Sequence, residues 1–176
     1  ESNQKDVHDL LIKYTDACFL YLRKQVQSGA DVIQIFDSWA NLLTKEGLIE
    51  FSFNYINSLI SALKLDPITK NIPVIIFARN PKCNIEELIN TSADCISLFW
   101  SMNDLNFEVA KNKVAIQGNL DPKILLESDE TIKRETYKIL ERFKEYPGYI
   151  FNLGHGITPD ISPDKIKYLT NIVREY

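Results

Sequence analysis

The sequence has 176 residues, of which 45% are hydrophobic and 25% charged, the usual composition of a single globular domain. The net charge is −4, and no basic block suggests a nucleic-acid or membrane-surface patch. No apolar run has the length of a membrane helix, and the polar first residues do not resemble a signal peptide. We therefore expect a soluble protein with no nucleic-acid or membrane partner.

Cysteine usage points to a reducing compartment. Cys18, Cys83 and Cys95 are far apart and form no C-x-x-C pair, so neither a disulfide framework nor metal binding by the three is expected. Cys18 and Cys95 fall on predicted buried faces, where a free cysteine packs as a small hydrophobic residue. A cytoplasmic protein is predicted.

The first element is a helix that begins near Val7 and ends near Gly29, because glycine suits the left-handed position after a helix. Apolar residues recur in it at three- and four-residue spacing and predict one buried face. That predicted face comprises Leu10, Leu11, Tyr14, Cys18, Tyr21 and Leu22.

Strands and helices alternate along the rest of the chain. Short apolar runs, rich in β-branched residues, predict strands at 31–36, 73–77, 95–99, 114–117 and 149–152. Helices are predicted at 47–65, 85–89 and 103–110, after the N-cap Ser128, and after Ser162 with Pro163 at the first helical position.

Wholly apolar strands that alternate with helices indicate a parallel α/β sheet. Two architectures fit: a doubly wound open sheet, or part of an eight-stranded barrel, which needs roughly 250 residues when complete. In both, the functional residues follow the carboxyl ends of the strands. Those segments combine aromatic residues, hydrogen-bond donors and two glycine-bearing loops, as a flat ligand with polar edges requires.

Three of these segments resemble the uroporphyrinogen decarboxylase family: residues 29–38, residues 117–122, and residues 151–157 with Pro159 and Asp160. The resemblance implies the C-terminal part, about five βα units, of an eight-stranded TIM-type (β/α)8 barrel, with residues 1–176 forming one partial barrel domain. It also implies that the first strands, their arginines and the essential catalytic aspartate lie upstream of Glu1. The chain alone is therefore predicted to be inactive.

The family's activity is decarboxylation of the four acetate side chains of uroporphyrinogen III to give coproporphyrinogen III. The resemblance implies a carboxy-lyase with a tetrapyrrole substrate, no metal or organic cofactor, and a homodimer for the intact enzyme. It assigns contacts with the substrate carboxylates to Ser38 and His155. Hydroxyl and imidazole donors suit a ligand with eight carboxylates. The neighbours Phe36, Asp37, Gly154 and Gly156 are candidate site-lining residues.

Some positions depart from the commoner family pattern and bear on the local site contacts. They are Trp39, Asn41, Arg79 with Asn80, and Phe99.

Other interpretations remain open from the residues. Ser38 is also a candidate helix N-cap, His155 a candidate turn residue, and Asp37 is expected to be structural. The corrinoid-linked methyltransferases share the fold and bind zinc through a His-x-Cys pair and a later cysteine, but the matching strand end here is Ile76-Phe77-Ala78-Arg79. A non-catalytic subdomain that associates through exposed sheet edges is the third alternative.

Overall fold

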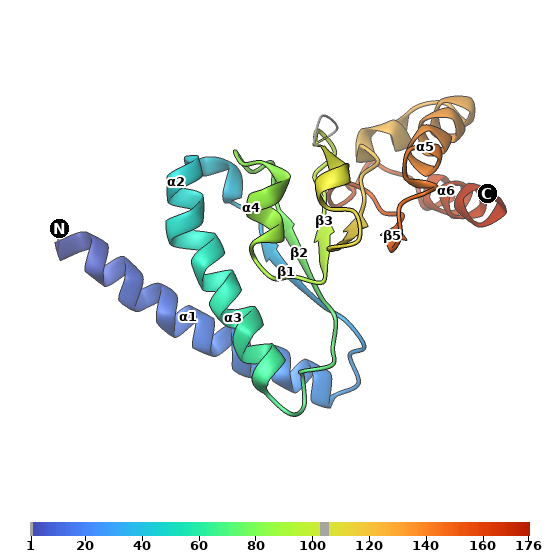
Figure 1. The fold of residues 1–176 in the computed structure, drawn as a ribbon. Coiled ribbons are helices and arrows are strands. Elements are labelled where there is room, and N and C mark those ends of the chain that lie inside the picture. Colours follow the sequence, from blue (N-terminus) through green and yellow to red (C-terminus); the bar gives the residue numbers. More distant parts are fainter. Residues whose placement is uncertain (1, 103–105) are drawn as a thin grey trace.

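The computed structural model describes residues 2–102 and 106–176, and within them five parallel strands alternate with helices (Figure 1). The strands are β1 (Ile33–Asp37), β2 (Val74–Ala78), β3 (Cys95–Ser97), β4 (Ala115–Gln117) and β5 (Tyr149–Ile150). The α-helices are α1 (Ser2–Gln27), α2 (Lys45–Leu48), α3 (Asn54–Leu65), α4 (Ile85–Ile89), α5 (Asp129–Phe143) and α6 (Pro163–Glu175). A π-helical stretch, η2 (Ile49–Phe53), joins α2 to α3, and short 3-10 helices occur at η1 (Ala40–Leu42), η3 (Phe107–Val109) and η4 (Pro122–Leu126).

The order of the strands decides between the two predicted architectures. The strands pair in the order β1-β2-β3-β4-β5, each with the next along the chain and all in parallel. A doubly wound sheet reverses direction at a switch point, and this sheet has none. Right-handed crossovers between successive neighbours place every helix on the same face, as in a barrel wall.

The sheet is also curved, as a contact between β1 and β4 shows. The Nε2 atom of Gln117 donates to Ser97 Oγ at 3.0 Å and to Gln34 Oε1 at 3.4 Å. In a flat sheet β1 and β4 would lie about 14 Å apart, with their side chains projecting side by side. These side chains converge because they line the concave face, so the chain is an arc of a barrel.

The opposite, convex face of the sheet forms the main core. Ile33, Ile76, Ile96 and Ile116 alternate with the concave-face residues and are almost fully buried against the helices. Figure 1 shows these helices following the strands from α1 and α3 to α5 and α6 in chain order. A second, smaller core lies between η4, α5 and α6.

The predicted buried face of α1 is only partly correct. Leu22 is buried and α1 packs on α3, but Tyr14 and Tyr21 are 64% and 66% exposed. Leu10 and Cys18 are also exposed, so placing Cys18 in the core was wrong, whereas Cys95 is buried. The helix carries two neighbouring apolar stripes, and only the stripe through Leu11, Phe19, Leu22 and Val26 faces the rest of the fold. No helix in the described ranges, α1 included, is long and apolar enough to cross a membrane.

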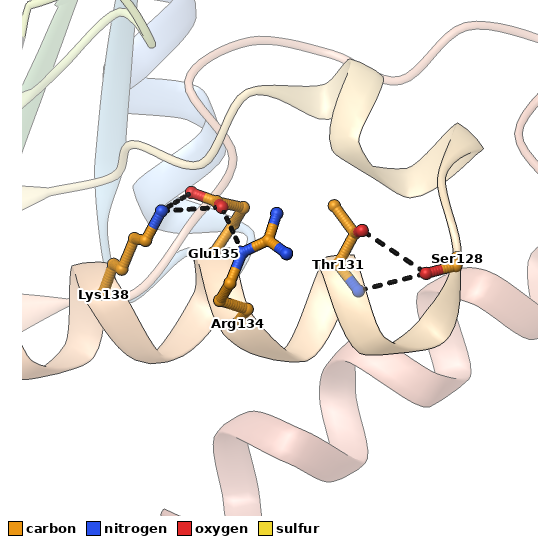
Figure 2. Close-up of polar contacts among 5 residues, drawn as sticks. All are labelled: Ser128, Thr131, Arg134, Glu135 and Lys138. Carbon is orange, nitrogen blue, oxygen red and sulfur yellow. Dashed lines mark hydrogen bonds and ion pairs between the residues drawn. The ribbon is translucent and has the colours of Figure 1, made fainter.

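Three predicted helix boundaries are confirmed: the end of α1 and the starts of α5 and α6. Gly29 has φ +101° after α1, and the Ser162 hydroxyl accepts the Asp164 N–H ahead of α6, which has Pro163 at its start. Figure 2 shows the cap of α5, where Ser128 Oγ accepts from the Thr131 N–H at 3.3 Å. Such caps fix where a helix begins because they satisfy its otherwise unpaired N–H groups.

Several predicted elements differ from the structure. Helix α1 begins at Ser2 rather than near Val7, β3 ends at Ser97 rather than at Phe99, and the predicted helix at 47–65 is divided into α2, η2 and α3. The predicted helix at 103–110 lies partly outside the described residues, and the described remainder is a single 3-10 turn, η3. The predicted last strand, 149–152, is regular only over Tyr149–Ile150, although the pairing resumes at Leu120 and Leu153. This interrupted ladder is the starting point of the candidate site.

Candidate functional site

A cleft of about 530 Å³ opens at the carboxyl ends of the strands, on the concave face of the sheet. Its polar lining side chains are Gln34, Ser38, Arg79, Ser97, Asn152 and His155. Strand alternation explains the set, because every second residue of a strand points to the same face. Side chains from β1, from β2 and β3, and from the loop after β5 therefore line the same cleft, as in barrel active sites.

Ser38 follows β1 and shares a face with Gln34 and Phe36, which also line the cleft. Its hydroxyl makes no hydrogen bond with any described residue. The N-cap alternative is not what the structure shows, because Thr44 caps α2 by accepting the Gly47 N–H at 3.2 Å. The Ser38 hydroxyl is thus available to a ligand.

His155 lies half-buried in the loop after β5 and faces the same cleft as Ser38. Its ring stacks on Phe99, with centroids 5.5 Å apart and an angle of 24° between the planes. Nδ1 lies 2.7 Å from the carbonyl oxygen of Gly156. Because a carbonyl oxygen only accepts, Nδ1 is the donor of this bond, and Nε2 is the ring nitrogen left for a ligand.

The two glycines beside His155 occupy different environments. Gly154 donates its N–H to the Leu120 carbonyl at 2.8 Å, and a Cβ on it would lie 2.3 Å from the Trp100 nitrogen. Gly154 therefore lies behind the cleft wall, where no side chain fits. Gly156 lines the cleft, and a Cβ there would meet nothing within 4 Å.

Asp37 points to the other side of β1 from Ser38. Its carboxylate accepts from the Ser52 hydroxyl at 2.5 Å and from the Trp39 N–H at 3.2 Å. It lines a neighbouring apolar groove rather than the cleft of Ser38 and His155, while Phe36 borders both. The alternation of strand residues, which places Asp37 with Ile35, accounts for this orientation.

No role was predicted for Arg79 from the sequence, although the structure places this residue in the cleft with Ser38 and His155. It stands two residues after Phe77, so the period-two pattern of β2 was the signal that places both on the concave face. Among the described lining residues Arg79 is the only permanently charged one.

The structure also bears on the possibility of a metal site. Within 2–102 and 106–176, no group of three or more His, Cys, Asp or Glu side chains is arranged to hold a metal ion. The thiols of Cys83 and Cys95 lie away from the cleft lining, and burial raises the pKa of each to about 12. A buried neutral thiol is a poor metal ligand, because the thiolate is the form that coordinates.

The fold and the cleft together define a class: an arc of a (β/α)8 barrel with a donor-lined cleft at the strand ends. A solved structure, a methyltransferase from Methanosarcina mazei, has this fold with a TM-score of 0.70 and 22% identity, over 92% of this chain and 47% of that one. The family model for uroporphyrinogen decarboxylase (URO-D) matches residues 1–176. The chain therefore belongs to the uroporphyrinogen decarboxylase family.

Curated relatives agree with this membership. The chain is 40% identical to the uroporphyrinogen decarboxylase of Vesicomyosocius okutanii over 172 residues, which is 97% of this chain and 49% of the relative. It is 40% identical to that of Chlorobaculum parvum over 177 residues, 96% and 48% of the two chains. The chain thus spans about half the length of the curated relatives it matches.

Proposed function

We propose that the protein containing this chain is a carboxy-lyase that converts uroporphyrinogen to coproporphyrinogen by removing its four acetate carboxylates. One observation supports the proposal beyond family membership: Ser38 and His155, far apart in sequence, open into one cleft that no described acidic side chain lines. A ligand with eight carboxylates needs such a donor-lined, acid-free wall.

Each donor has a defined part in holding the substrate. The free hydroxyl of Ser38 donates to one carboxylate arm. His155 presents Nε2 to another arm, because Nδ1 is already engaged by the Gly156 carbonyl. Phe36 and Phe77, which also line the cleft, offer apolar surface to the flat macrocycle.

In the proposed reaction the pyrrole ring is its own electron sink. A ring carbon is first protonated. The bond between the acetate methylene and its carboxylate carbon then breaks, CO₂ leaves, and the electron pair of that bond neutralises the cationic ring. The exposed methylene gains a proton while the ring carbon loses one, leaving a methyl group. A carboxylate facing the pyrrole N–H groups stabilises the cationic stage. We place that aspartate upstream of Glu1, so this chain supplies binding and not the acid.

Further parts of the proposal rest on the family resemblance. They are a cofactor-independent reaction and a homodimer for the intact enzyme. The cytoplasmic location rests instead on the cysteines, and the absence of a nucleic-acid partner on the net charge. The proposal also includes one partial barrel domain formed by residues 1–176. The three free cysteines accord with a reducing compartment.

The test is decarboxylation by the protein expressed from the complete gene, with His155→Asn and Ser38→Ala as variants. Loss of one hydrogen bond to a charged group predicts a fall in kcat/KM of roughly ten- to a hundredfold for each variant. Ser61→Ala, on the exposed surface of α3, is the matched control and retains activity. Absence of decarboxylation by the unsubstituted protein, or full activity in both variants, would refute the proposal.

A further inference from the structure

We propose that Arg79 is a third anchoring residue, which binds a carboxylate arm of the ligand through a bidentate ion pair. The inference deepens the proposed function and rests on it for the identity of the ligand. Neither the comparisons nor the family motifs in this chain assign a role to this side chain.

The backbone around Arg79 fixes its position at the cleft. Its N–H donates to the Asp37 carbonyl at 3.0 Å, which extends the pairing of β1 and β2 one residue past the end of β2. Asn80 then turns the chain with φ +43°, and its side-chain oxygen accepts from the Ser101 hydroxyl at 3.2 Å. The Arg79 side chain therefore leaves an anchored backbone on the concave face, next to Ser38.

The charge of Arg79 is not neutralised within the described part of the chain. Asp37 is its neighbour across the β1–β2 pairing, but that carboxylate points to the convex side and is held by Ser52 and the Trp39 N–H. No carboxylate of a described residue forms an ion pair with the guanidinium. As far as the described residues show, a chain with net charge −4 thus presents an uncompensated cation in its cleft.

The chemistry of the side chain identifies the group it takes. A guanidinium presents parallel N–H donors that match the two oxygens of a carboxylate, and it stays charged at every working pH. Ser38 and His155 each supply a single donor. Arg79 adds a positive charge to the cleft lining, and its paired donors fix the orientation of the bound carboxylate. The bound group is a peripheral carboxylate of the macrocycle, and its role is positioning rather than proton transfer.

The experiment compares Arg79→Gln and Arg79→Lys with the unsubstituted protein expressed from the complete gene. Arg79→Gln raises KM for uroporphyrinogen about tenfold and leaves kcat within about twofold, the expected loss of one charge-assisted pair. Arg79→Lys recovers most of the affinity, because a point charge remains. Arg134→Gln is the matched control, since Arg134 lies on the exposed face of α5 beside Glu135, outside the cleft (Figure 2).

Direct binding separates this inference from the proposed function. The probe is the oxidised, fluorescent porphyrin with the same eight carboxylates, titrated at several salt concentrations. Affinity that falls less steeply with salt in Arg79→Gln than in the unsubstituted protein supports the ion pair. Binding without turnover would refute decarboxylation but leave Arg79 as an anion site. Unchanged KM, affinity and salt dependence in Arg79→Gln would overturn the inference, as would failure of the unsubstituted protein to bind the probe.

Discussion

The backbone of Gly154 lies directly against the backbone of Trp100, so closely that a Cβ on Gly154 would be 2.3 Å from the Trp100 nitrogen and 2.5 Å from its Cα. This contact brings the loop after β5 against the end of β3. It also sets the position of the next residue, His155, whose ring stacks on Phe99 immediately before Trp100. The imidazole is thus positioned by a close approach of two backbone segments.

The first prediction compares the two glycines that flank His155. Gly154→Ala places a methyl group against backbone atoms that cannot move aside, so we expect it to destabilise the fold by about 1–3 kcal/mol. It also displaces His155 and weakens ligand binding. Gly156→Ala is the control, because its Cβ meets nothing within 4 Å and its φ is not in the left-handed region. Urea unfolding of both variants measures the difference, and equal stability would contradict the account.

Local chemistry made much of the fold predictable. The caps Ser128 and Ser162 mark helix starts through side-chain bonds to the backbone within three residues, and such signals need no tertiary context. The apolar runs of the strands are equally local, because both faces of a parallel sheet are covered. The strand ends followed from them, whereas the choice of Ser38 and His155 among the residues there came from the family resemblance; the structure places both in one cleft.

Features that depend on distant partners were not predictable in the same way. Periodicity showed that α1 is apolar, but not which of its two stripes faces α3, so Tyr14 and Cys18 were placed on the wrong side. The contact between Gln117 and Gln34 joins residues 83 positions apart and depends on the curvature of the whole sheet. The orientation of Asp37 depends on its partner Ser52, 15 residues further along the chain, whose hydroxyl donates to the carboxylate on the convex side.

The second prediction concerns the reactivity of the three thiols. Cys18 is exposed, whereas burial raises the pKa of Cys83 and of Cys95 to about 12. Since the thiolate is the nucleophile, we expect Cys18 to react at least about a hundredfold faster with an aromatic disulfide reagent at mild pH. The coloured product should appear as one fast equivalent in the native protein and three in denaturant. A fast phase that survives Cys18→Ser would show that another thiol is accessible.

The third prediction concerns the capping box of α4. Glu87 accepts from the Asn84 N–H at 2.8 Å and pairs with Lys45. Partial burial on its own raises the pKa of Glu87, but the bonds from Lys45 and Asn84 outweigh it and leave that pKa below its usual value. Glu87→Gln should therefore cost about 1 kcal/mol of unfolding free energy near pH 7.

The pH dependence of that cost follows from the sign of the shift. The ionised form is favoured in the folded state, so its stabilisation is complete above the unfolded pKa of about 4.3 and disappears as pH falls through the lower folded value. The unfolding free energies of Glu87→Gln and of the unsubstituted protein should converge once the pH lies below the folded pKa of Glu87. Glu86→Gln, an exposed neighbour in the same turn, serves as the control and should show little cost. A cost for Glu87→Gln that persists in acid would contradict the assignment.

The fourth prediction tests how His155 meets a carboxylate. With Nδ1 held by the Gly156 carbonyl, Nε2 is the ring nitrogen left to contact a carboxylate. His155→Gln offers an amide donor at a similar reach, whereas His155→Phe keeps an aromatic ring beside Phe99 but has no donor. The protein from the complete gene should therefore bind the eight-carboxylate porphyrin about tenfold more tightly with His155→Gln than with His155→Phe, as measured by fluorescence titration. Equal affinities of the two variants would show that His155 gives the ligand no hydrogen bond.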